Sequence, residues 1–145
     1  MRLSRNAHYA FRTVLDLARH GRARSSEIAR RQGIPPAYMA KVVQGLGRAG
    51  ILRTFRGIRG GVELARPAAG LTLRAVLEAA EGPLALNLCA LWGDCPCQQP
   101  CPVRATLARA EAAVERELAV TVAELAAQLP ENGRGRRAPQ ARAAG

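Results

Sequence analysis

The sequence contains few aromatic residues and no long hydrophobic run. Aromatic residues make up 3% of the 145 positions, so the core has to be built mainly from Leu, Val, Ile and Ala, a composition that favours helices. No stretch approaches the roughly 18 apolar residues of a membrane span. The N-terminal residues contain no apolar signal core either. We therefore expect a cytoplasmic protein with a helix-rich core and no membrane partner.

Acidic residues are scarce in the first half of the chain. Residues 1–74 carry 15 Arg or Lys against three Asp or Glu, whereas residues 75–132 carry three against eight. The tail from Gly133 carries four Arg and no acid, and the whole chain has a net charge of +11. An asymmetry of this size indicates an anionic partner, most often nucleic acid, in preference to a merely solvated basic surface.

The sequence also lacks the signatures of a substrate site. It has no glycine-rich phosphate loop, no catalytic triad and no paired carboxylates near either histidine, His8 or His20. We therefore predict that the protein is not an enzyme and that it takes no small-molecule substrate.

Cysteines are few, and all four lie in one segment. Cys89, Cys95 and Cys101 are spaced six residues apart, and Cys97 lies between the last two. Structural disulfides are rare in cytoplasmic proteins, whereas clustered thiolates suit zinc, copper(I) or an iron–sulfur cluster. Three interpretations stay open from these residues: an iron–sulfur cluster, a structural zinc with four thiolates, and a metal-free thiol switch that works by disulfide formation.

The pattern of apolar residues, caps and turns predicts a winged helix-turn-helix domain over residues 1–81. Two short helices around a glycine-containing turn are typical of helix-turn-helix, and a glycine-rich hairpin after them is typical of a wing. The fold class is therefore mainly α with a small β-hairpin wing. The predicted helices run from the cap Ser4 to about His20, from the cap Ser25 to the turn at Gly33, from Pro36 to Gly50 and from the cap Thr72 to about Ala80, and the predicted strands are 51–55 and 62–64.

The third helix and the hairpin turn carry residues that suit DNA. In helix-turn-helix proteins the N-terminal part of the second helix meets base edges in the major groove. Lys41 suits guanine or phosphate, Gln44 suits adenine, and Tyr38 suits either packing or a phosphate contact. Arginines at the hairpin turn suit a narrow minor groove. The predicted DNA-contacting residues are Pro36, Ala37, Tyr38, Lys41, Gln44, Arg56 and Arg59.

A long helix is predicted over residues 103–129. Its apolar residues recur at spacings of four and three, which is nearly a heptad seam. One narrow apolar stripe requires a partner, and a homodimer is favoured over a back-folded contact within the chain. Residues 82–102 form the cysteine-rich loop, and residues 130–145 are predicted to be disordered. The expected interface residues are Val103, Leu107, Val114, Leu118 and Leu125.

From Met1 to about Leu129 the chain resembles the dimeric bacterial winged-helix regulators that include IscR, the iron–sulfur biogenesis regulator, and NsrR, the nitric-oxide-sensitive repressor. The segments that carry the resemblance are 1–4, 9–12, 34–46, 56–61 and the Cys-x5-Cys-x5-Cys spacing. Residues 121–125 resemble the nitric-oxide branch more closely. The resemblance implies a transcriptional regulator, most simply a repressor, that binds double-stranded DNA at an inverted-repeat operator as a homodimer.

The resemblance also implies an iron–sulfur cluster, 2Fe–2S or 4Fe–4S, that governs DNA affinity and is held by Cys89, Cys95 and Cys101. The fourth ligand departs from both branches, because Arg104 stands where the biogenesis branch has a histidine and His8 stands where the nitric-oxide branch has a carboxylate. Imidazole is an accepted cluster ligand. The preferred fourth ligand is therefore His8 of the partner subunit, with Cys97 as its competitor.

Overall fold

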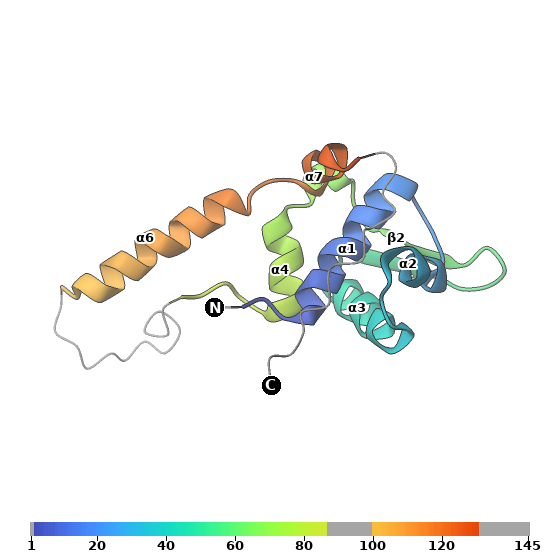
Figure 1. Ribbon diagram of the computed structural model, residues 1–145, viewed down its shortest axis with the longest axis horizontal. Coiled ribbons are helices and arrows are strands. Elements are labelled where there is room, and N and C mark those ends of the chain that lie inside the picture. The colour runs from blue at the N-terminus through green and yellow to red at the C-terminus, as the bar shows by residue number, and fades with distance from the viewer. Residues whose placement is uncertain (1, 87–99, 131–145) are drawn as a thin grey trace, which may run out of the picture.

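Figure 1 shows the computed structural model, which describes residues 2–86 and 100–130. The prediction of a mainly α fold with a β-hairpin wing is confirmed. The two strands are antiparallel, with Leu52 opposite Leu64 and Phe55 opposite Gly61. In chain order the elements are α1 (Arg5–His20), α2 (Ser25–Gln32), α3 (Pro36–Arg48), β1 (Leu52–Phe55), β2 (Gly61–Leu64), the 3-10 helix η1 (Ala68–Gly70), α4 (Leu73–Glu81), α6 (Pro102–Glu117) and α7 (Val122–Gln128).

Helix α1 is the central element, because α2, α3, α4, α7 and β2 all pack against it. Its burial therefore extends around several sides of the helix and includes polar residues. Leu17 and the polar Thr13 and Asp16 are buried, whereas Phe11 and Leu15 are only partly covered. The hydroxyl of Thr13 is satisfied inside the helix, where it donates to the carbonyl oxygen of Tyr9 at 2.8 Å.

The helix boundaries follow the caps that the sequence carries, with one exception. Ser4 and Thr72 accept the backbone N–H groups of Ala7 and Ala75, as expected of N-caps. The prediction that Ser25 caps α2 is wrong, because Arg24 occupies the cap position and makes no side-chain capping bond there. Helix α2 ends at Gly33, whose φ of 60° and ψ of 39° lie in the left-handed region that glycine tolerates best.

The prediction of one continuous helix over residues 103–129 is wrong. Helix α6 stops at Glu117, and Thr121 begins α7 with a reciprocal capping box in which the side chains of Thr121 and Glu124 each bond the other's backbone N–H. The hydrogen bonds from Thr121 lower the pKa of Glu124. Val122 is fully buried, and its N–H donates to Leu71 at 2.8 Å. Capping and burial therefore outweigh the heptad spacing, and the seam residues Leu118 and Leu125 do not share one helix.

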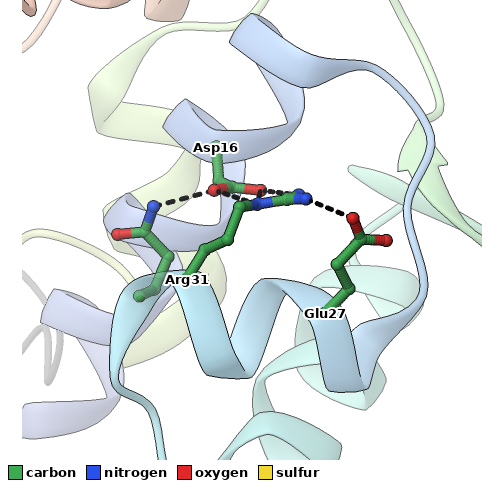
Figure 2. Close-up of polar contacts among 4 residues, drawn as sticks. Asp16, Glu27 and Arg31 are labelled. Carbon is green, nitrogen blue, oxygen red and sulfur yellow. Dashed lines mark hydrogen bonds and ion pairs between the residues drawn. The ribbon is translucent and has the colours of Figure 1, made fainter. Parts of the chain in front are cut away.

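A buried ion pair joins α1 to α2 (Figure 2). The Asp16 side chain is 0% exposed and accepts from Nε of Arg31 at 3.0 Å and 3.2 Å and from Nε2 of Gln32 at 2.8 Å. Arg31 also donates to Glu27 at 2.8 Å. These bonds, chiefly the one to Asp16, raise the pKa of Arg31 further above its already high ordinary value. Arg31 is therefore a permanent cation that holds the end of α2 against α1.

We predict that Asp16→Asn lowers the free energy of unfolding by about 3 kcal/mol, because it leaves a partly buried guanidinium without its anion. Glu27→Gln serves as the control, since Glu27 is the more exposed partner of the same arginine and its removal should cost less than about 1 kcal/mol. Urea unfolding followed by circular dichroism at one protein concentration measures both. Equal losses in the two variants would contradict the special weight given to the buried carboxylate.

Candidate nucleic-acid interface

Helix α3 separates a buried face from an exposed face. Met39, Val42 and Leu46 lie in the core. Pro36 occupies the first turn, where its missing N–H leaves no helical hydrogen bond unmade. The five residues predicted to meet the major groove are all exposed, namely Pro36, Ala37, Tyr38, Lys41 and Gln44.

Tyr38 both packs and faces solvent. Its ring meets that of Tyr9 on α1 edge to face, with centroids 5.6 Å apart, and the Nζ atom of Lys41 lies 6.0 Å from the Tyr38 centroid. The residue is still 40% exposed. The two interpretations of Tyr38 are therefore compatible, because Tyr9 on α1 supports the ring while part of the residue remains exposed to solvent.

The wing tip, residues 56–60, is a tight turn that only glycine permits. The N–H of Gly60 donates to the carbonyl oxygen of Gly57 at 2.9 Å, and the φ of Gly57 is 92°. A Cβ atom on Gly60 would lie 2.7 Å from the carbonyl oxygens of Phe55 and Gly57. Arg56 and Arg59 are exposed on this turn. The backbone thus presents the two arginines at a fixed protrusion of the molecule (Figure 1).

The beginning of α2 lies between α3 and the wing. Ser25 and Ser26 line a groove with Pro36 and Met39 on one side, and they line a second groove with Thr54 and the wing glycines on the other. The three elements therefore follow one another along one surface. We call α2, α3 and the hairpin together the reading head.

Arg24 is a residue of this surface that the sequence did not single out. Its Nη2 atom donates to the carbonyl oxygen of Ile58 at 3.0 Å and so anchors the wing tip to the start of α2. Arg22 supports the base of the wing through a cation–π contact, with its guanidinium carbon 4.6 Å from the centre of the Phe55 ring. Neither arginine has a sequence signal that distinguishes it from other surface cations, because its partner lies more than thirty residues further along the chain.

The acidic residues of the basic half are all engaged away from the predicted DNA contacts. Asp16 and Glu27 pair with Arg31, and Glu63 pairs with Arg22 and Arg53. Across residues 2–86 and 100–130, Lys41, Arg56 and Arg59 take part in no ion pair. Their charge is therefore available for phosphate contacts, which supply most of the sequence-independent affinity for DNA.

The predicted metal ligands fall partly within the structure. Cys101 is half-buried, forms no disulfide and stands at the N-cap of α6. His8 is exposed on α1, with its ring 6.4 Å from that of Phe11, and Arg104 is exposed near the start of α6. Cys89, Cys95 and Cys97 lie outside the described residues. Among those that are described, no three His, Cys, Asp or Glu side chains form a group that could hold a metal ion.

The predicted interface residues are the apolar positions of α6 and α7. Val103 is 64% exposed, and the other four are half-buried: Leu107, Val114, Leu118 and Leu125. None of residues 102–117, all of which the structure describes, is fully buried. Figure 1 shows α6 extending away from the other helices, so the described part of the chain covers its apolar stripe only in part.

Two helices around a tight turn, followed by a basic glycine-rich hairpin, define a winged-helix DNA-binding protein. A family model described as Rrf2, iron-dependent transcriptional regulator, matches residues 3–128. The chain therefore belongs to the Rrf2 family of transcriptional regulators. In the described residues no helix is long and apolar enough to cross a membrane.

Individual relatives agree with this assignment. The chain is 39% identical over 114 residues to protein aau3 of Rhizobium meliloti, which covers 76% of this chain and 74% of that one. It is 34% identical over 86 residues to the HTH-type transcriptional regulator IscR of Cereibacter sphaeroides, which covers 56% of each chain. The relatives that carry a function in their names are transcriptional regulators, in agreement with the prediction that this protein is not an enzyme.

Solved structures show the same fold. The global cysteine regulator CymR of B. subtilis superposes with a TM-score of 0.73 at 23% identity, over 90% of this chain and 99% of that one. IscR of T. potens superposes with a TM-score of 0.70 at 24% identity, over 90% and 93% of the two chains. The similarity to IscR and to the Rrf2 type is thus shown, while the closer kinship to the nitric-oxide branch stays a prediction.

We predict that Arg59→Ala weakens DNA binding about tenfold, the usual cost of losing an arginine that reads a groove. Arg109→Ala is the matched control, because it removes the same charge from exposed α6, far from the reading head. An operator selected from a random DNA pool serves as the ligand, and fluorescence anisotropy gives the dissociation constants. Equal losses in the two variants would show that the wing contributes only general charge.

Proposed function

We propose that the protein is a homodimeric repressor whose affinity for an inverted-repeat operator is controlled by an iron–sulfur cluster. Membership of a family described as iron-dependent and the likeness to IscR support the cluster. The likeness to the cysteine regulator CymR leaves two alternatives to the cluster open. These are a structural zinc site and a metal-free thiol switch.

The donor set fits a cluster by its chemistry. Thiolates are the usual ligands of iron–sulfur clusters, and an imidazole is accepted at one or two positions. Cys89, Cys95 and Cys101 would hold the cluster, with His8 of the partner subunit as the fourth ligand and Cys97 as its competitor. A bound cluster supplies ligation that responds to oxidants, nitric oxide or iron supply. Arg104, exposed three residues after Cys101, would place a positive charge beside an anionic group.

The observation that carries the proposal is a polar junction between the first turn of α1 and the C-terminal end of α4, from which the chain leads into the cysteine segment. We call residues 82–102 the cysteine segment; it begins directly after Glu81, the last residue of α4. The carboxylate of Glu81 accepts from the backbone N–H of Ser4 at 3.1 Å and from the Ser4 hydroxyl. Asn6 donates to the carbonyl oxygen of Ala80 at 3.2 Å.

The same junction reaches the proposed fourth ligand. Ser4 caps α1, and its carbonyl oxygen accepts the N–H of His8 at 3.3 Å. A rearrangement of the cysteine segment that displaces the end of α4 would therefore act on the first turn of α1, and α1 packs directly against α3. Ligation of His8 would act on that same turn. A helix shift biased by one ligand bond is a known form of switching element.

The proposed dimer is supported by the way α6 is attached. The guanidinium of Arg74 on α4 lies 2.9 Å from the carboxylate of Glu115 on α6 and 2.9 Å from that of Glu78 within α4. The backbone N–H of Arg74 donates to the carbonyl oxygen of Leu118 at 2.9 Å, so the C-terminal end of α6 is fixed to α4. The opposite end carries exposed Val103 and half-buried Leu107, which line a common apolar hollow with Pro102 and Thr106. Most of the stability of a helix in a protein comes from packing of its apolar face, so a second copy packed on this end of α6 would stabilise it.

We predict that Leu107→Glu weakens the dimer about a hundredfold or more, because a carboxylate cannot be buried at the interface without a partner. Ala112→Glu adds the same charge on the opposite side of α6 and should leave the dimer intact. Sedimentation equilibrium or light scattering over a concentration series measures both. A wild-type protein that is monomeric at micromolar concentration would refute the proposed dimer.

For the cluster, we predict that Cys89→Ala, Cys95→Ala and Cys101→Ala each abolish visible absorption and iron and sulfide content after anaerobic purification. Cys97→Ala should retain them. His8→Ala should keep part of the cluster but change its spectrum and the response of DNA binding to oxidation.

The opposite pattern has a definite meaning. If Cys97→Ala loses the cluster while His8→Ala matches the wild type, Cys97 is the fourth ligand and the route through α1 fails. Stoichiometric zinc without sulfide would favour the structural zinc site, and an absence of both metals would favour the thiol switch.

A further inference from the structure

Among the described residues, the most exposed large apolar side chain is Ile58, at 93% of its surface. It stands in the wing tip between Arg56 and Arg59. A single exposed apolar side chain is common on protein surfaces and needs no explanation by itself. What distinguishes Ile58 is how firmly its backbone is held and what surrounds it.

The wing tip fixes the position of Ile58 on two sides. In the turn closed by the Gly60 N–H and the Gly57 carbonyl, Ile58 and Arg59 occupy the two central positions. A Cβ atom at Gly60 would clash with the carbonyl oxygens of Phe55 and Gly57, so this tightly closed turn requires glycine at that position. The carbonyl oxygen of Ile58 is in addition anchored to Arg24 at 3.0 Å. The side chain is therefore presented to solvent by a well-supported backbone.

We propose that Ile58 is a specificity-determining residue that contacts the floor of the operator's minor groove and rejects G·C pairs there. The inference rests on the proposed function and on the prediction that the arginines of the hairpin turn enter a narrow minor groove of the operator. The floor carries only acceptor atoms at A·T pairs, whereas guanine adds its exocyclic 2-amino group. A branched apolar side chain fits against the groove floor of an A·T pair. At a G·C pair the same side chain would crowd the 2-amino group of guanine and exclude water from it, without offering a hydrogen-bond acceptor in return.

This role differs from that of the flanking arginines. Arg56 and Arg59 respond to the negative potential of a narrow groove, an effect that salt screens. The contact of Ile58 depends on shape, so its discrimination does not follow the salt concentration. Many minor-groove proteins insert apolar side chains into the groove. The wing tip combines such a side chain, Ile58, with the basic side chains of Arg56 and Arg59.

The test uses the selected operator with each A·T pair in turn replaced by inosine·C or by G·C. These two replacements present the same major groove and differ only in the 2-amino group of the minor groove. We expect the wild type to bind the inosine duplex about tenfold tighter than the G·C duplex at the positions under the wing, within the usual cost of one mismatched pair. Ile58→Ala should reduce that ratio to about twofold, whereas Ile58→Val should largely preserve it.

The controls separate this inference from the proposed function. Because Ile58 is exposed, its variants should keep the wild-type circular dichroism and dimer mass. Arg59→Ala should weaken binding to both duplexes and, at high salt, leave the ratio in place. If Ile58→Ala keeps the wild-type ratio, the inference about Ile58 is overturned while the wing assignment stands. If Arg59→Ala has no effect, the placement of the wing in the minor groove fails and the inference fails with it.

Discussion

The geometry of the reading head depends on the buried carboxylate of Asp16. It holds Arg31 and Gln32, the last two residues of α2, and Gly33 then turns the chain into α3. Arg12, one turn earlier on α1, donates to the carbonyl oxygen of Gln32 and so adds a second bond between α1 and the end of α2. Helix α3 is thus positioned by the polar bonds between the end of α2 and α1 and by its own apolar face of Met39, Val42 and Leu46. Burial of a charge is costly, but its direction-dependent bonds fix an orientation that apolar packing alone leaves less defined.

Because α1 is also bonded to α4 through Ser4 and Glu81, the two ends of α1 have different roles. The N-terminal turn is bonded to the residues that lead into the cysteine segment, and the C-terminal half is bonded to the reading head. A packed helix moves largely as a unit, since cores resist continuous deformation. The proposed cluster therefore needs no contact with DNA to influence it. The same logic explains why the fourth ligand matters: a ligand on α1 acts on the helix that orients α3, whereas Cys97 would close the site within the cysteine segment.

The sequence predicts the local features of this fold better than its long-range ones. The caps Ser4 and Thr72 and the glycine turn of the wing are determined by residues close together in the chain, and they appear as expected. The burial of Asp16 could not be predicted, because it results from packing on several sides of α1. The break between α6 and α7 did have a signal: Thr121 and Glu124 have capping-box spacing. Thr121 also continues the apolar spacing of the preceding helix, so the periodicity and the capping signal conflict at this residue, and in the structure the cap prevails. The contact of Arg24 with Ile58 spans 34 positions and has no local signal.

The rigidity of the wing connects recognition to regulation. The tip is anchored by Arg24 to the start of α2, and its base is supported by Arg22, so the hairpin is bonded to the segment that leads into α2. In a two-fold dimer, a rotation of each head displaces the two wing tips relative to one another more than it displaces the residues near α1, because the tips lie farther from that helix (Figure 1). A general phosphate contact tolerates a small displacement, since charge attraction falls off gradually with distance. A shape contact such as that of Ile58 does not, because dispersion and steric exclusion change within about 1 Å. A short-range contact at the wing tip would therefore be the part of the interface most sensitive to the state of the cysteine segment.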